Sequence, residues 1–339
     1  MGYPRKSLIC LEETPYYHVV ARCVRRAWLW GYDAYAGKDY SHRKAWVLHR
    51  LRHLADVFAI DLCAYAIMSN HYHLVLRVDR QRALDWDHTE VVARWARLFS
   101  APPLIQRWQE GNANAAERAI AEELIERWRQ RLIDISWYMR CLNEYLARRA
   151  NAEDQCTGRF WEGRFKSQAL LDETGLLMAM AYVDLNPVRA GIAATPEESE
   201  FTSIHARLRQ ARSAAPSTRR AQRHARRRSG PQISPPLLAF SDPSHPASRH
   251  IPMTFRDYLQ LLDWTGRRRP SGKHALLGDL PPILTRLQLD PQVWRRTMQA
   301  GGRLLGRALG RWERLQAYAR RLGQSWIRQF GSKRKSQPV

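Results

Sequence analysis

Two short apolar runs joined by a two-residue turn constrain the fold of this chain more than any other feature. Residues 62–68 and 71–78 are rich in strand-forming residues, and Ser69-Asn70 between them has turn chemistry. The pattern predicts a β-hairpin. Because the residues around the turn are mostly hydrophobic, we expect this hairpin to be a central pair of strands in a larger sheet.

The hairpin lies within a longer alternation of strand-like and helix-like patterns. Helical spacing or strand-like composition marks the following segments: a strand over 16–23, a helix over 39–59, a strand over 164–171, and a helix over 172–185 that Asn186-Pro187 ends. The order is strand, helix, two strands, helical insert, strand, helix. It predicts an α+β fold in which helices flank an antiparallel sheet.

Three further segments differ in composition. Residues 80–150 hold two or three long helical patterns, including 115–133 and 135–150, and are predicted to form a helical insert. Residues 211–250 are rich in Pro, Ser and Arg, which predicts a flexible basic linker. Helical spacing then recurs over 253–264, 281–287, 291–299 and 304–330. We therefore predict a domain over 1–210, a linker over 211–250 and a small, basic, all-helical domain over 251–339.

Positive charge is concentrated in the second part of the chain. The 339 residues carry a formal net charge of +23, and residues 203–339 hold 28 Lys/Arg against 6 Asp/Glu. Residues 1–202 are almost neutral, with 27 against 26. Because the excess is mostly Arg, which prefers phosphate, we interpret the second part as a nucleic-acid-binding arm on a catalytic body. A solubilising surface is the alternative interpretation.

The cysteines and the lack of long apolar runs bear on location. The five cysteines form no CxxC pair, and the chain is too large to need disulfides for stability. No apolar run reaches the length of a membrane span, and residues 1–11 lack the apolar segment of a secretion signal. We expect reduced thiols, a cytoplasmic location and no membrane partner.

The segment His71-Tyr72-His73 is a candidate cation site. Alternate residues of a strand face the same side, so both imidazoles could reach one ion. With 12 His in the chain, about 0.4 such matches arise by chance, so the motif alone favours two ordinary histidines. The central position of the strand and the rigidity of a sheet favour a metal site instead. Neither cysteines nor an HExxH spacing accompany the pair, which argues against structural zinc.

A second candidate element lies at the end of the helix predicted over 172–185. Tyr182 and Asn186 are four residues apart and therefore adjacent on one helix face. A phenol and an amide oxygen could point together at the sheet. In the alternative interpretation Tyr182 is a core aromatic and Asn186 only ends the helix before Pro187.

Four segments, taken in order, resemble the HUH single-tyrosine transposases, in particular the REP-associated tyrosine transposases and the insertion-sequence-200-like transposases. They are YYHVVARCVRR at 16–26, AIMSNHYHLVLRV at 66–78, GRFWEGRFKSQ at 158–168 and YVDLNPVRAG at 182–191. The resemblance covers most of residues 1–210 and implies a ferredoxin-like catalytic domain. It also implies that His71 and His73 bind a metal, that Asn186 is a third ligand, and that Tyr182 is the nucleophile.

The function implied by this resemblance is single-stranded DNA cleavage and strand transfer through a covalent 5′-phosphotyrosine at Tyr182. Imidazole and amide ligands without thiolate suit Mg²⁺ or Mn²⁺. The expected partner is single-stranded, hairpin or repeat DNA in a bacterial cytoplasm, close to the nucleoid. The residues predicted to contact DNA are Arg22, Arg25, Arg26, Arg159, Arg164, Lys166 and Arg189. Around Phe160-Trp161, core packing with solvated arginines is an equal alternative.

Two other functions are compatible with these residues. One is a catalytically inactive protein that only binds DNA repeats, and the other is a metal-dependent phosphohydrolase that uses water in place of Tyr182. The sequence leaves open the DNA target, the role of the insert and the oligomeric state. A homodimer that shares active-site parts between subunits is as compatible with it as a single chain.

Overall fold

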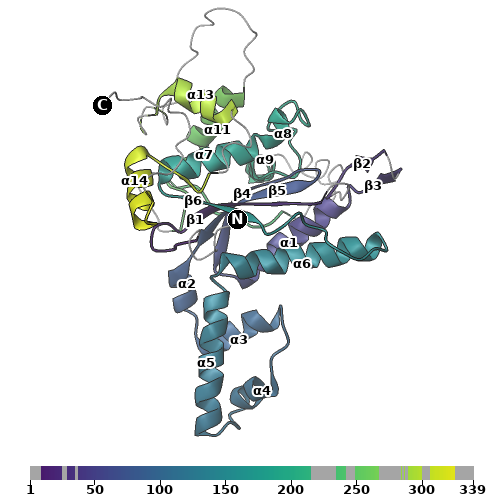
Figure 1. The fold of residues 1–339 in the computed structure, drawn as a ribbon, viewed down its shortest axis with the longest axis vertical. Coiled ribbons are helices and arrows are strands. Elements are labelled where there is room, and N and C mark those ends of the chain that lie inside the picture. Colours follow the sequence, from purple (N-terminus) through teal and green to yellow (C-terminus); the bar gives the residue numbers. More distant parts are fainter. Residues whose placement is uncertain are drawn as a thin grey trace, which may run out of the picture.

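A computed structural model describes residues 9–24, 29–34, 37–214, 234–241, 249–266, 284, 286, 289–299 and 306–324. Its centre is a five-stranded sheet with the strand order β4-β5-β1-β6-β7. Helices cover both faces of this sheet (Figure 1). The predicted α+β class, with a mostly antiparallel sheet between helices, is confirmed.

The strands of the main sheet follow the sequence patterns closely. They are β1 (Tyr16–Arg22), β4 (Ile60–Ile67), β5 (His71–Val78), β6 (Lys166–Leu170) and β7 (Ala308–Leu309). The predicted hairpin is β4–β5, and β1 pairs antiparallel with both β5 and β6. The short β7 adds to the edge of β6 in the parallel sense. A separate two-stranded ribbon consists of β2 (Tyr32–Asp33) and β3 (Lys38–Asp39).

One face of the sheet is covered by α1 (Arg43–Val57) and α6 (Ile135–Glu153) (Figure 1). The apolar residues of α1 recur at helical spacing and are buried, among them Leu48, Leu51 and Leu54. They pack in the larger of two hydrophobic cores, together with Tyr72 and Leu74 of β5. Because side chains alternate along a strand, His71 and His73 face the opposite side of the sheet.

The opposite face is covered by α7 (Glu173–Asp184), α8 (Asn186–Arg189), α9 (Ser203–Ala214), α11 (Phe255–Gly266) and α13 (Pro291–Gln299) (Figure 1). The second hydrophobic core lies here and includes Val75, Leu177, Met180, Leu261 and Trp294. The helix α7 is buried on nearly every side, which explains why its sequence is apolar almost throughout.

The fully buried carboxylate of Asp184 joins α7 to its neighbours. It accepts hydrogen bonds from the Ser203 hydroxyl and the Ile204 N–H at the start of α9, and from the Tyr258 hydroxyl of α11. Burial raises the pKa of Asp184, and these donors oppose that effect. The end of α7, where the candidate tyrosine lies, is thus fixed by helices from two later parts of the chain.

Residues 80–150 are mostly helical, as the sequence predicts, but α6 at the end of this segment packs on the sheet. The part before α6 contains α2 (Arg80–Leu84), α3 (His88–Ala96), α4 (Pro103–Gln109) and α5 (Ala115–Arg131), and the last three project from the body as an arm (Figure 1). Asn114 and Glu117 form a capping box at the start of α5. The ring of Trp95 on α3 stacks on that of Trp128 on α5, with centroids 5.2 Å apart.

The described part of residues 251–339 packs on the body of the protein and includes the strand β7, whereas the sequence predicted an all-helical region. Tyr258 and Leu261 of α11 share the second core with α7, and Tyr318 of α14 (Trp312–Arg321) belongs to the first. The amphipathic faces of these helices find their apolar partners on the body. A separate DNA-binding domain over 251–339 stays a prediction.

The segment predicted as a linker is partly packed. Leu238 is buried and donates its N–H to the Leu62 carbonyl of β4 at 2.8 Å. Most of the Arg-rich part, residues 215–233, and residues 242–248 lie outside the described residues. In the described ranges, none of the helices combines the length and apolarity needed to cross a bilayer.

Candidate active site

Polar side chains gather on the sheet face that α7 covers. The register places Arg22 opposite His71 and Val20 opposite His73, while His18 lies opposite Gln168 of β6 and Val20 also opposite Lys166. Directly paired residues project to the same face. Three strands therefore contribute two cations, three imidazoles and an amide to one part of this face.

The structure brings together the two histidines, Tyr182 and Asn186 in a single chain. The ring centroids of His71 and His73 are 5.0 Å apart, and that of Tyr182 is 5.5 Å from His73. The Nδ2 atom of Asn186 is 3.2 Å from Nε2 of His73. No second subunit is needed to complete this cluster.

The local sequence explains how the helix presents Tyr182 and Asn186. The Asp172 side chain caps the start of α7 by accepting from the Gly175 N–H. The helix ends after Asp184, and Asn186-Pro187 begins the short helix α8, with proline in the first turn where its missing N–H is tolerated. Leu185 between them keeps a helical conformation. Tyr182 and Asn186 therefore remain one turn apart on the face that meets the sheet.

The histidines of the cluster are held in the neutral form. Burial lowers the pKa of His71 to about 4 and that of His18 to about 4. The pKa of His73 falls well below its ordinary value, first because of burial and then because of the neighbouring histidines. A neutral imidazole has the free lone pair that a metal ligand needs.

The surroundings of Tyr182 shift the pKa of its phenol by two opposing effects. Burial raises the pKa of Tyr182, while the Arg189 cation, the Asn186 hydrogen bond and the Arg22 cation lower it. The Arg189 guanidinium lies over the Tyr182 ring, 4.9 Å from the centroid. A developing phenolate at this position would therefore meet positive charge from α8 and from β1.

The His73 and Asn186 side chains fit a shared cation. Turning the Asn186 amide over places its oxygen where Nδ2 now lies, 3.2 Å from His73 Nε2. A separation of this size is compatible with two atoms that bind the same ion. Among the described residues no three His, Cys, Asp or Glu side chains are grouped for a metal. The side-chain amide of Asn186 is the group beside His73 that could offer an oxygen ligand.

The predicted DNA contacts divide into three groups. Arg22, Arg164 and Lys166 line a cavity of about 470 Å³ that also exposes His71, His73 and Tyr182, and Arg189 lies over the tyrosine. Arg159 is exposed and does not line this cavity. Arg25 and Arg26 lie outside the described residues.

Phe160 and Trp161 pack into the body of the protein. Phe160 is buried, and Trp161 donates its indole N–H to the Asn143 carbonyl of α6 at 2.9 Å. The Trp161 ring also meets the edge of Tyr72 in the first core. Both aromatics therefore contribute to core packing, as the core-packing alternative has it.

Sequence reasoning missed four polar residues of the site. His18 and Gln168 lie next to His73, the Asn70 side-chain oxygen accepts from Nδ1 of His71 at 2.8 Å, and Glu162 lines the cavity. The alternation of side chains along β1 could have identified His18 from the sequence. His18 is two residues from Val20 and four from Arg22, which places it on the same face as both.

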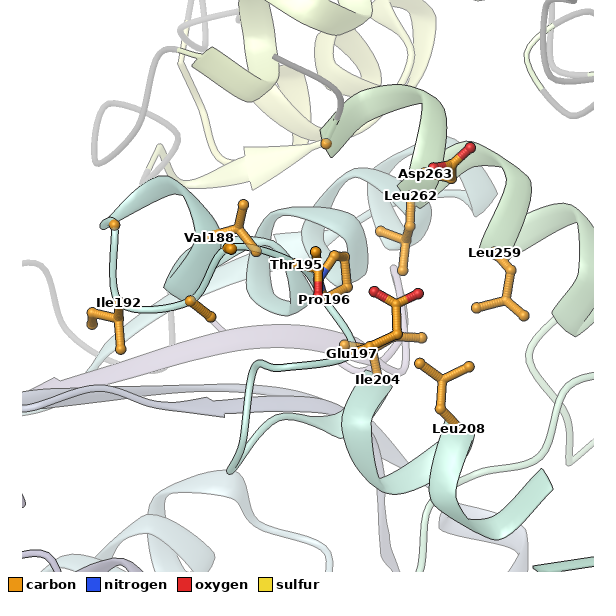
Figure 2. Close-up of a pocket in the computed structure, with 14 residues that line it drawn as sticks. Val188, Ile192, Thr195, Pro196, Glu197, Ile204, Leu208, Leu259, Leu262 and Asp263 are labelled. Carbon is orange, nitrogen blue, oxygen red and sulfur yellow. The ribbon is translucent and has the colours of Figure 1, made fainter. Parts of the chain in front are cut away.

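A larger cavity of about 780 Å³ lies between α9, α11 and the loop after α8, as Figure 2 shows. Its walls are mostly apolar, with Ile204 and Leu208 on one side and Leu259 and Leu262 on the other. None of its lining residues belongs to the histidine and tyrosine cluster. The candidate active site is therefore the smaller, more polar cavity.

The chain was compared with known proteins. No protein-family model matches it, and no curated protein matches it. The solved structure of a REP-associated tyrosine transposase bound to a REP hairpin is similar to this chain with 13% sequence identity and a TM-score of 0.38. The similarity covers 64% of this chain and 89% of the other. A likeness this distant does not establish a shared fold or activity, so the proposal below depends on the site itself.

Proposed function

We propose that the protein is a divalent-cation-dependent, single-stranded DNA nicking and strand-transfer enzyme of the tyrosine transposase type, with Tyr182 as the nucleophile. The observation that carries the proposal is the cluster of Tyr182, His71, His73 and Asn186 in one polar cavity. Each motif alone has an ordinary structural explanation. Ordinary packing does not explain why two histidines of a strand meet a tyrosine and an asparagine that lie more than a hundred residues later in the sequence.

The histidines and Asn186 supply the ligands of the cation. His71 and His73 are neutral, and the Asn186 amide can present its oxygen. When bound, Mg²⁺ or Mn²⁺ would neutralise charge on a phosphate and fix its geometry. The absence of thiolate ligands at the cluster suits these two metals.

Tyr182 performs the covalent step. Its phenol oxygen forms a bond to the phosphorus of a phosphodiester while the bond from phosphorus to the 3′ oxygen breaks. The products are a 5′-phosphotyrosine and a 3′-hydroxyl, and the proton that leaves the phenol is balanced by the one that the 3′ oxygen gains. Attack by another 3′-hydroxyl reverses the step and joins strands without ATP. Arg189 stabilises the developing negative charge at the phenol.

The cavity favours a single strand as substrate. Arg22, Arg164 and Lys166 line it and can contact consecutive phosphates. Its volume of about 470 Å³ is on the scale of a small-molecule pocket, which suits one nucleotide outside a duplex. Hairpin or repeat DNA is the substrate class that we propose, with the Arg-rich segment as an additional contact.

The test is a cleavage assay on a 5′-labelled and a 3′-labelled single-stranded hairpin DNA with Mn²⁺ or Mg²⁺. We expect cleavage, and a protein–DNA adduct that survives denaturation and carries the DNA 3′ of the nick. Tyr182→Phe should abolish both cleavage and adduct while DNA binding persists, because only the nucleophilic oxygen is removed.

Three outcomes would contradict the proposal. Cleavage by Tyr182→Phe at the wild-type rate would exclude this nucleophile. Metal-dependent cleavage without an adduct would indicate a phosphohydrolase that uses water. Tight binding of hairpin DNA without cleavage at any metal concentration would indicate a DNA-binding protein without activity.

A further inference from the structure

A line of hydrogen bonds runs beneath the candidate cation site and links all three strands of its floor. Nε2 of His18 is 3.0 Å from Nδ1 of His73, and Nδ1 of His18 is 3.3 Å from Oε1 of Gln168. Asn186 meets the other nitrogen of His73. His18 and Gln168 are each 1% exposed, so water does not compete for these contacts.

The Gln168 end of this line sets the direction of its protons. The Gln168 oxygen can only accept, so His18 carries its proton on Nδ1 and offers the lone pair of Nε2. His73 must then donate from Nδ1, which leaves its Nε2 without a proton. With the Gln168 amide turned over, every proton would shift, and His73 Nε2 would carry hydrogen in place of a lone pair.

We propose that Gln168 and His18 are positioning residues that fix His73 in the Nδ1-protonated tautomer and so keep its Nε2 free to bind the cation. This inference deepens the proposed function, since the importance of the tautomer rests on His73 being a ligand. Ligating histidines commonly donate their second ring N–H to a fixed acceptor, which orients the ring and sets the tautomer. Here the acceptor is another imidazole, and its own tautomer is set by an amide.

His71 has a simpler version of the same arrangement. Its Nδ1 is 2.8 Å from the Asn70 oxygen, so it too donates away from the site and leaves Nε2 free. Asn70 is exposed, whereas the partner of His73 is buried. The tautomer of His73 is therefore the more firmly fixed of the two, and a change at His18 should affect the cation site through His73 alone.

The direct test is the tautomer of His73 in the full-length, metal-free protein. Long-range ¹⁵N–¹H correlation spectra of histidine-labelled protein distinguish the two tautomers, and His73→Gln identifies the signals. We expect wild-type His73 to be protonated on Nδ1. In His18→Leu the acceptor is lost and both tautomers should be populated. In His18→Gln an amide oxygen reaches the position of Nε2 and should restore the wild-type pattern.

A metal titration provides a second readout that needs no DNA and no activity. We expect Mn²⁺ affinity, measured by electron paramagnetic resonance, to fall by about 10-fold to 100-fold in His18→Leu and to be largely recovered in His18→Gln. Gln168→Leu should lie between the two variants. Thermal unfolding of each variant shows whether a loss of affinity reflects a loss of fold.

The outcomes separate this inference from the proposed function. Wild-type His73 protonated on Nε2, or His18→Leu binding Mn²⁺ as tightly as wild type, would overturn the inference while leaving metal-dependent cleavage intact. Wild-type protein that binds no Mn²⁺ would overturn the proposed function, even with the tautomer as expected. If His18→Leu does not fold, the wild-type tautomer alone decides.

Discussion

Tyr182 is only 6% exposed, as a core aromatic would be, so burial does not distinguish a nucleophile from a packing residue. Its neighbours do. A core tyrosine is surrounded by apolar side chains, whereas the Tyr182 ring meets the edges of His18 and His73 and lies under Arg189. Desolvated polar groups cost stability, and clusters of them around one titratable group are typical of functional sites. The residue-scale evidence therefore lies in the contacts of Tyr182.

Arg189 gives a prediction at this scale. Substituting Arg189→Gln removes the cation over the phenol, so we expect the single-turnover cleavage rate to fall by about 10² to 10³, as when a charge-stabilising donor is removed. DNA affinity should change less, because Arg22, Arg164 and Lys166 still line the cavity. Both the single-turnover cleavage rate and the DNA affinity are measured on one oligonucleotide. Arg159→Gln is the matched control, because Arg159 lies outside the cavity. Equal losses in rate and affinity would make Arg189 a simple phosphate contact.

The sequence predicts some site residues and not others for a physical reason. The spacing of His71 and His73 and that of Tyr182 and Asn186 are local, so strand and helix periodicity place each pair on one face. The contact of His18 with Gln168 depends on the register between β1 and β6, strands about 150 residues apart in sequence. Register is set by packing of the whole sheet, which no local pattern reveals.

At the scale of elements, hydrophobic periodicity predicts most helices and strands of the body to within a few residues. The helix predicted over 115–133 is Ala115–Arg131, and the hairpin strand predicted over 71–78 is His71–Val78. The strand Ala308–Leu309 fell in a segment predicted as helix. A two-residue strand has no periodicity of its own, and it exists here because β6 offers an edge to pair with.

The contact between β7 and α7 gives a prediction at this scale. A Cβ atom added to Gly175 would overlap the Leu309 carbonyl oxygen, so the glycine allows the strand to approach the helix. Alanine normally stabilises a helix over glycine by about 1 kcal/mol, but here we expect Gly175→Ala to lower the free energy of unfolding by about 1–3 kcal/mol. Urea denaturation measures the difference.

Gly163 is the matched control for that experiment. A Cβ at Gly163 meets nothing within 4 Å, so Gly163→Ala should leave stability almost unchanged. Stabilisation by Gly175→Ala would show that β7 does not pack closely on α7 in solution.

At the scale of the whole molecule, the charge distribution and the packing give different pictures of the second part of the chain. The charge distribution suggests one basic appendage after residue 202. Yet the described elements of that region bury Tyr258, Leu261 and Leu309 in the cores of the body. Deleting everything after residue 210 would expose those cores and confuse loss of fold with loss of DNA contacts. Substitutions confined to the Arg-rich segment test its role without that ambiguity.

The segment holds six arginines within ten residues: Arg219, Arg220, Arg223, Arg226, Arg227 and Arg228. Replacing all six with glutamine should weaken single-stranded DNA binding and flatten its salt dependence. Each lost phosphate contact lowers the slope of log K against log salt by about 0.7, so the slope should fall by up to about 4. Fluorescence anisotropy at several salt concentrations measures both quantities, and thermal unfolding should be unchanged.

A second variant separates local contacts from overall charge. It replaces six exposed arginines of the helices α3–α6, reducing the net charge equally: Arg97, Arg107, Arg118, Arg127, Arg140 and Arg148. Long-range attraction falls in both variants, but only a segment that touches the strand releases counterions on binding. A larger loss of slope in the first variant would identify the Arg-rich segment as the basic arm. An equal loss would mean that net charge alone attracts DNA, and a larger loss in the second would assign that role to the surface of the helical region α3–α6.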